Sequence, residues 1–478
     1  MSQRYATQDV DVSPLGQPLH FEFSQRRASN RFLKAALTER MASWSATELP
    51  ARGIPTPELI NLYRRWGEGG YGVILTGNLM IAYDQLEAMG NMIIDLENEF
   101  SGGRFEAFQQ LANAAKQHGS LVIGQVSHPG RQTEQRFQPN PVSASDIQLI
   151  TDQAPYAKPR PASMDDIEDI TRRFVHAAVY LQKAGFDGIQ LHGAHGYLLA
   201  QFLSQTTNKR TDQYGGSLEN RARLTVEIAQ AIRAAIPDPQ FILSIKINSV
   251  EFQAHGFTPD EAKELCEILD RNGFDFVELS GGTYEEMAFQ HRRESTRMRE
   301  SFFLEFADRI TPALKRTRSY VTGGFRTASG MVHALNTVDG VGLGRPICQE
   351  CRLPKDLLAG TVQSAIEPKL DPQNFILTGA ASGAHMHQVG DDQQPSDMSD
   401  EAMVGVYMQC LGQWVQKVQE DFAAMTFTGY PRLPKGHPYQ VRPGESQPWE
   451  ISGYQPKTGL WRFALCLALV PSIMYFVW

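Results

Sequence analysis

The sequence has few cysteines and no surplus of positive charge. Its 478 residues include five cysteines, too few and too scattered for a disulfide scaffold, which indicates a reducing compartment such as the cytoplasm. Lysine and arginine total 45 against 53 aspartates and glutamates, so the formal net charge is −8. A negative protein repels nucleic-acid phosphates, and we therefore expect no nucleic-acid partner. The first thirty residues are polar, and we expect no secretory leader.

Long apolar runs are also missing, except near the C-terminus. Residues 463–478 read FALCLALVPSIMYFVW and carry no charge. A helix of this length spans ~24 Å, short of the ~30 Å hydrocarbon core of a bilayer, and Pro471 predicts a kink. Two interpretations stay open for residues 461–478: a membrane anchor or interfacial segment, or a helix packed against the protein or a partner.

A third absence concerns glycine. No G-x-G-x-x-G follows the first strand candidate, which argues against a doubly wound dinucleotide-binding sheet. The sequence instead contains eight apolar runs that alternate with helical stretches, as in repeated βα units. These runs are residues 32–37, 71–76, 120–126, 186–192, 241–247, 274–280, 320–323 and 338–343. We therefore predict an α/β fold, with a (β/α)8 TIM barrel over residues 1–365.

Helix start signals separate the strand candidates. Thr56 and Thr258 each precede a proline at the first helical position, and Glu261 completes a capping box with Thr258. Ser163, followed by two aspartates, predicts another helix start of the same kind. These signals place helices between the strands, as a barrel requires.

The alternating pattern stops after residue 345. Residues 365–400 are rich in Gly, Asp, Gln and Ser and predict an exposed loop, whereas residues 400–424 predict an amphipathic helix. We assign residues 366–427 to a loop and helix that pack on the barrel. Residues 428–460, with many prolines and glycines, predict a linker to the apolar tail.

The reacting groups of such barrels lie at the C-terminal ends of the strands. The candidates there are Ala36, Leu37, Thr38, Gly77, Asn78, Gln125, His192, His195, Tyr197, Lys246, Gly323, Gly324, Phe325, Gly344 and Arg345. Glycine-rich turns follow the last two runs, where backbone N–H groups commonly bind a phosphate, and Arg345 offers a charge-assisted contact. We therefore expect a phosphorylated ligand.

Two histidines in the sequence HGAH are open to three interpretations. His192 and His195 have a spacing that suits a shared metal, but no third ligand accompanies them, and we expect no metal site. A structural role inside the barrel mouth is the second interpretation. The one we favour is a pair of hydrogen-bond donors that hold a substrate oxygen, with Tyr197 as a nearby source of a proton.

Several of these segments resemble the old yellow enzyme family of flavin-dependent ene-reductases. They are LHGAHGYLLAQFLSQTTNKRTDQYGGSLENRARLTVEIAQAI (191–232), SNRFLKAALTERMAS (29–43), GQVSHPGRQ (124–132), SIKINSVEF (244–252), VTGGFRT (321–327) and VGLGRPI (341–347). The likeness covers roughly residues 15–365, and the central block is highly specific. The resemblance implies a barrel that binds FMN and is reduced by NADPH or NADH in the same pocket.

The resemblance also assigns the cofactor positions. It implies that the phosphate of FMN lies at Gly323, Gly324, Phe325, Gly344 and Arg345. The flavin ring would meet Ala36, Leu37, Thr38 and Gly77 on one side, and Gln125 and Lys246 at its pyrimidine edge. Many relatives have arginine where this chain has Lys246, so the charge is kept without the planar fork.

For the substrate, the resemblance implies an α,β-unsaturated carbonyl compound. His192 and His195 would hold the carbonyl oxygen while flavin N5 delivers a hydride to the β-carbon, and Tyr197 would protonate the α-carbon. Tyr83 and Tyr284, on loops after the second and sixth strand candidates, are predicted to contact substrate at the rim. Some relatives have asparagine at the position of His195.

Two other functions remain open from the sequence. The same FMN barrel can return the hydride it has taken, which would give redox-neutral isomerisation or cyclisation of a biosynthetic intermediate. The chain can also be a catalytically inactive binding protein tethered to a membrane by residues 461–478. The retained set of site residues argues against loss of catalysis.

Overall fold

The computed structural model describes residues 2–447, apart from 152–153, 252–255, 283–303, 373 and 427–428. Eight parallel strands within this part of the chain form a closed barrel, because β3 pairs with both β13 and β4. The barrel strands are β3 (Phe32–Lys34), β4 (Val73–Met80), β6 (Leu121–Ser127), β9 (Gly188–Gly193), β10 (Ile242–Asn248), β11 (Phe276–Ser280), β12 (Arg318–Thr322) and β13 (Gly340–Leu343). Each overlaps one predicted run, and the predicted (β/α)8 TIM barrel is confirmed.

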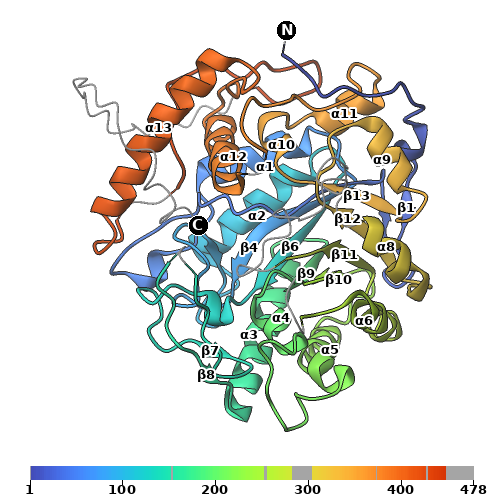
Figure 1. Cartoon of the computed structure of the whole chain (residues 1–478), viewed down its shortest axis with the longest axis vertical. Coiled ribbons are helices and arrows are strands. Elements are labelled where there is room, and N and C mark those ends of the chain that lie inside the picture. The colour runs from blue at the N-terminus through green and yellow to red at the C-terminus, as the bar shows by residue number, and fades with distance from the viewer. Residues whose placement is uncertain are drawn as a thin grey trace.

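Helices surround the barrel (Figure 1). They are α1 (Pro57–Gly67), α2 (Gly102–Lys116), α3 (Met164–Lys183), α4 (Leu198–Leu203), α5 (Leu218–Ala235), α6 (Pro259–Arg271), α8 (Leu304–Ile310), α9 (Ala328–Ala334), α10 (Pro346–Gln349) and α11 (Leu353–Leu358). The predicted starts are confirmed: Thr56 caps α1, and Ser163 and Thr258 form capping boxes at α3 and α6.

Short elements complete the barrel. The antiparallel pair β1 (Leu19–His20) and β2 (Arg27–Ala28) closes its N-terminal end, because Phe21 beside this pair packs 5.5 Å from the ring of Phe276 inside the barrel. The remaining strands are β5 (Met92–Ile93), β7 (Val142–Ser143) and β8 (Arg160–Pro161). The N-terminal half of the barrel interior is apolar, so the polar side chains lie toward the opposite end, the C-terminal mouth.

The C-terminal region differs from the prediction. The expected exposed loop over residues 365–400 is wrong for α12 (Phe375–Gly390), whose residues from Ala380 onward are buried. Alanine and glycine at many positions give this helix no amphipathic period, yet they let it pack closely. Its Gly383 has the ring of Tyr430 where a side chain would begin, so no larger residue fits.

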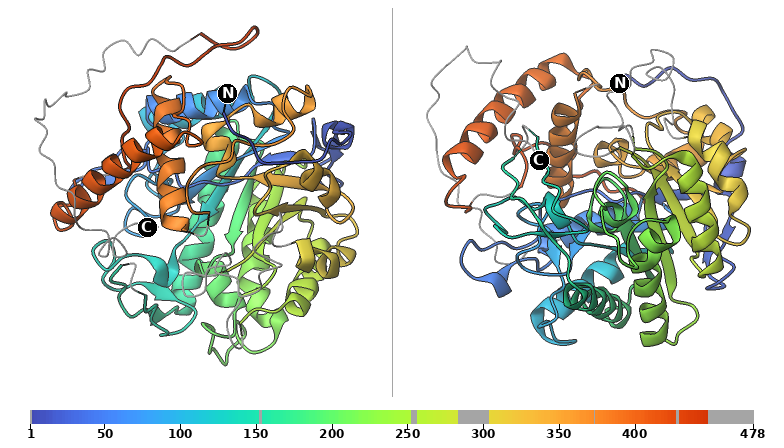
Figure 2. Two further views of the ribbon diagram at one scale, coloured as in Figure 1. Left: turned by 45° about the horizontal axis from the view of Figure 1, so that its top comes forward. Right: turned by 60° about the horizontal axis from the view of Figure 1, so that its bottom comes forward.

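The predicted amphipathic helix is α13 (Glu401–Glu420), which starts at the capping residue Asp400. It packs on α12 through Tyr407, Leu411 and Trp414, so α12 lies between it and the barrel (Figure 2). Residues 429–447 of the predicted linker also pack on the molecule, where Tyr439 is buried.

The apolar tail, residues 461–478, lies outside the described residues. Within the part of the chain that the structure describes, no helix is both long enough and apolar enough to cross a membrane.

Candidate active site

A cavity of about 430 Å3 opens at the C-terminal mouth of the barrel. This volume lies in the usual range for small-molecule and cofactor sites. Its wall includes these predicted residues: Ala36, Leu37, Thr38, Asn78, Gln125, His192, His195, Tyr197, Lys246, Gly323, Gly324, Phe325, Gly344 and Arg345. Residues far apart in the sequence therefore meet at one site.

The three candidate reacting side chains lie together on this wall. The ring of His192 at the end of β9 has its centroid 5.5 Å from that of His195 and 4.4 Å from that of Tyr197. Tyr197 is the residue before α4, so the end of β9 and the turn that follows it present all three. His195 adopts a φ of 56°, a conformation that is strained for a side chain of this size and that recurs at functional sites.

Hydrogen bonds fix the orientation of the two imidazoles. The backbone N–H of Ala194 points to Nδ1 of His192, 3.4 Å away, which favours the tautomer with its proton on Nε2. His195 has Nε2 at 2.9 Å from the hydroxyl of Ser280, and its backbone N–H donates to Asn248 Oδ1 at 3.1 Å. Each ring therefore has a defined contact that limits its rotation.

Burial lowers the pKa of both imidazoles, which favours their neutral forms. It lowers the pKa of His195 to about 3, with a smaller contribution from the charge of Lys246. The pKa of His192 is lowered well below its usual value by burial, then by His195 and Lys246. A neutral imidazole donates one hydrogen bond and accepts another, so the pair suits a carbonyl oxygen.

Asn78 was a strand-end candidate without an assigned role, and the structure places it beside the phenol. Its Nδ2 lies 3.4 Å from the hydroxyl of Tyr197, and its buried Oδ1 has no hydrogen-bond partner in the described structure. A buried amide oxygen without a partner is unusual and suits a ligand that donates a hydrogen bond.

The glycine turns after β12 and β13 lie at another side of the cavity. Gly323 and Gly324 have φ values of 147° and 80°, which side chains rarely adopt, so the backbone there stays uncovered. The half-buried Arg345 follows β13, and its guanidinium donates to Thr378 Oγ1 of α12 at 2.6 Å. Bare backbone together with a half-buried guanidinium fits the phosphate predicted from the sequence.

Gly77, a predicted flavin contact, does not line the cavity but packs against Leu37, which does. Its N–H points to both Glu39 Oε1 at 3.0 Å and the hydroxyl of Tyr63 at 2.9 Å, and a Cβ at Gly77 would lie 2.1 Å from the Glu39 carboxylate.

Lys34 forms a buried pair with Glu39. It lies 3.9 Å from this carboxylate and 4.1 Å from the ring of Trp66. Burial lowers the pKa of Lys34 to about 8 and raises that of Glu39. In the sequence, the feature that could have revealed the Lys34–Glu39 pair is a charged residue, Lys34, inside the apolar run of residues 32–37.

The two rim tyrosines have different outcomes. Tyr83 is buried away from the cavity wall, where its hydroxyl accepts a hydrogen bond from Asn98 Nδ2 at 2.6 Å. Its position indicates a packing role. Tyr284 lies outside the described residues.

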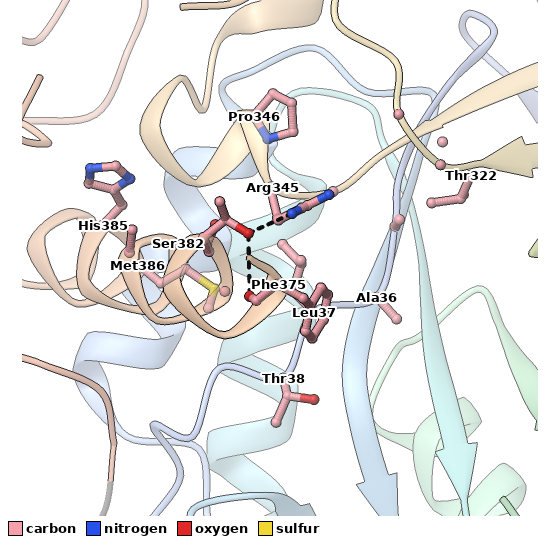
Figure 3. Close-up of a pocket in the computed structure, with 18 of the residues that line it drawn as sticks. Ala36, Leu37, Thr38, Thr322, Arg345, Pro346, Phe375, Ser382, His385 and Met386 are labelled. Carbon is pink, nitrogen blue, oxygen red and sulfur yellow. Dashed lines mark hydrogen bonds between the residues drawn. The ribbon is translucent and has the colours of Figure 1, made fainter. Parts of the chain in front are cut away.

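Sequence reasoning missed the wall that α12 adds to the cavity. Phe375, Ser382, His385 and Met386 of this helix line the cavity. Figure 3 shows Phe375 beside Leu37, and Ser382 beside Arg345. Tyr430 also lines it, and its hydroxyl donates to the backbone oxygen of Thr38 at 2.9 Å. No signal in the sequence joined these residues to the barrel, because they follow the last βα unit.

Comparison with known proteins decides the family. The sequence profile of the NADH:flavin oxidoreductase / NADH oxidase family matches residues 15–362. The chain belongs to this family. The resemblance to the old yellow enzymes is thereby confirmed, and the protein is an oxidoreductase of the flavin-dependent class.

Other members of the NADH:flavin oxidoreductase family are similar over most of the chain. The NADH-dependent flavin oxidoreductase nadA of Aspergillus parasiticus is 49% identical over 426 residues, which cover 88% of this chain and 96% of that protein. The NADH-dependent flavin oxidoreductase iliE of a Neonectria species is 33% identical, over 73% of this chain and 47% of its own length. Morphinone reductase in complex with tetrahydroNAD shares the fold, with a TM-score of 0.59 and 23% identity over 74% of this chain and 93% of that one.

Proposed function

We propose that this flavin oxidoreductase uses FMN and a nicotinamide nucleotide to reduce the activated C=C bond of α,β-unsaturated carbonyl compounds. One observation carries the proposal: two imidazoles and a phenol converge on the wall of a cavity at the barrel mouth. That set can bind a carbonyl oxygen and supply a proton, which are the two tasks that alkene reduction requires of the protein.

The cavity wall has the donors that FMN needs. Gly323, Gly324 and Arg345 would hold its phosphate, and Thr38 would hydrogen-bond the ring. Gln125 and Lys246 would reach the pyrimidine edge, where a positive charge stabilises the reduced ring. When bound, FMN supplies hydride transfer from its N5 to the β-carbon of the substrate.

The protein's own residues would do the rest. His192 and His195 donate hydrogen bonds to the carbonyl oxygen, which draws electron density from the alkene and makes its β-carbon electrophilic. Tyr197 gives the proton of its hydroxyl to the α-carbon from the opposite face. Asn78, 3.4 Å from that hydroxyl, keeps the phenol in place.

The reductant is proposed to be NADH. The names of nadA and iliE both describe NADH-dependent proteins, and this supports NADH over NADPH for the present chain. The nicotinamide would enter the same cavity as the alkene, so the two substrates would alternate.

The test starts with the absorption spectrum of purified protein after addition of FMN. Anaerobic reduction with NADH and with NADPH, followed by reoxidation with 2-cyclohexenone, should consume one nicotinamide for each alkene reduced. Turnover of an alkene without net nicotinamide loss would support isomerisation or cyclisation instead. Protein that is colourless after FMN has been added and the unbound FMN removed would contradict the proposal and support an inactive binding protein.

A further inference from the structure

A buried carboxylate lies in the centre of the barrel, beneath the proposed flavin site. Glu278 of β11 has no solvent exposure, and it does not line the cavity. It faces inward from a strand whose register pairs it with Lys246 of β10. A charge buried this deeply is costly unless other groups compensate it, so its partners indicate its role.

Three other strands of the barrel, β9, β10 and β12, each supply a partner to this carboxylate. Lys246 Nζ lies 3.0 Å from Oε1, and the Thr322 hydroxyl donates to the same oxygen at 2.6 Å. Oε2 accepts a hydrogen bond from Gln190 Nε2 at 3.0 Å. Both oxygens of Glu278 are therefore satisfied, and its charge lies next to the ammonium group of Lys246.

The contacts continue to the other predicted pyrimidine contact. Gln190 has its side-chain oxygen bonded by Gln125 Nε2 at 2.7 Å. A continuous series therefore runs from Lys246 through Glu278 and Gln190 to Gln125, and its two end members line the cavity. This series fixes which atoms Gln125 can present, because one hydrogen of its amide is already used.

We propose that Glu278 is a positioning residue that sets the reduction potential of the flavin. This inference rests on the proposed function, in which Lys246 and Gln125 contact the pyrimidine edge of the flavin. Glu278 holds the ammonium group of Lys246 in place and offsets its positive charge. Gln190, which is hydrogen-bonded to Glu278, holds the amide of Gln125 in place in turn. A reduced, negatively charged ring is therefore stabilised less than it would be by an unpaired lysine.

The test measures the reduction potential of the FMN-loaded protein by equilibration with a dye of known potential. Glu278→Gln keeps the size of the side chain and removes its charge, so the potential should shift to a more positive value and sulfite should bind the flavin more tightly. Lys246→Gln should shift both measurements in the opposite direction. The double variant should return close to the wild-type potential, because the two charges are lost together.

A matched control separates charge from general damage to the fold. Glu68 is also buried and pairs with Arg65 at 2.9 Å on α1, outside the cavity. Glu68→Gln should lower the midpoint of thermal unfolding without moving the flavin potential. If the Glu278→Gln protein does not fold, the potential of the double variant compared with that of Lys246→Gln still measures the effect of removing Glu278.

The outcomes are distinct. An unchanged or more negative potential in folded, FMN-loaded Glu278→Gln would overturn the inference, as would shifts of the same sign in both single variants. Wild-type protein that does not bind FMN at all would instead overturn the proposed function.

Discussion

The hydroxyl of Tyr430 donates a hydrogen bond to the backbone oxygen of Thr38, 2.9 Å away and 392 positions earlier in the chain. The ring of Tyr430 also packs on Gly383 of α12, and the guanidinium carbon of Arg40 lies 4.9 Å from the centre of the same ring. The C-terminal segment is thus joined to the strand end where the flavin ring is proposed to bind. This contact gives the first prediction.

Replacing Tyr430 with phenylalanine should weaken FMN binding about fivefold, because a hydrogen bond of this kind contributes about 1 kcal/mol. Titration of the apoprotein with FMN measures the change. Tyr407→Phe is the matched control, since its hydroxyl donates to the Leu377 oxygen at 2.7 Å, away from the cavity wall. Equal loss of FMN affinity in both variants would show that the Tyr430 contact has no particular role in the site.

Tyr197→Phe should slow alkene reduction by about 100-fold or more, the usual contribution of a general acid. Reduction of the flavin by NADH needs no proton from this phenol and should stay nearly unchanged. Stopped-flow absorbance measures the two half-reactions separately. A similar loss in both half-reactions would refute the role of Tyr197 as proton donor.

Arg345→Met should raise the dissociation constant of FMN by about 10- to 100-fold, because hydrogen bonds to a charged group contribute about 1.5–3 kcal/mol. Riboflavin lacks the phosphate and provides the control: its affinity should change little. Fluorescence titration with both flavins measures this difference. An equal loss for FMN and riboflavin would place the phosphate elsewhere.

The pH dependence of stability should change in His385→Gln. Burial lowers the pKa of His385 to about 4, whereas the unfolded residue titrates near its usual 6.5. Between these values the unfolded state binds a proton that the folded state does not, so the free energy of unfolding falls as the pH falls from 6.5 to 4. In that window the variant should lose about 1.4 kcal/mol less per pH unit than the wild type.

Chemical denaturation at several pH values between 4.5 and 7.5 measures these slopes. The other titrating groups contribute equally to both proteins, so the difference isolates His385. Identical slopes would mean that the folded protein takes up a proton at His385 as readily as the unfolded chain.

The barrel was predictable because its signals are local. Each strand is a short continuous apolar run, and residues such as Thr56 and Thr258 mark the following helices through contacts only three positions away. That His192, His195 and Tyr197 lie together was predictable for the same reason, since the short segment 192–197 carries all three.

The remaining features depend on contacts between distant segments. Helix α12 has alanine and glycine where an amphipathic helix would alternate, so only its packing against the barrel reveals it. The Glu278–Lys246 pair depends on the register of two strands, and the Tyr430–Thr38 contact on how the chain returns to the mouth. Neither register nor return path can be read from residue spacing alone.

The position of Tyr430 has a consequence for biosynthesis. Thr38 leaves the ribosome early, but its partner Tyr430 is made 392 residues later. A nascent chain can close the eight-stranded barrel before α12 and Tyr430 have left the exit tunnel. The pocket that we assign to FMN then still lacks one wall, so we expect the flavin to be captured late, after most of the chain has already folded.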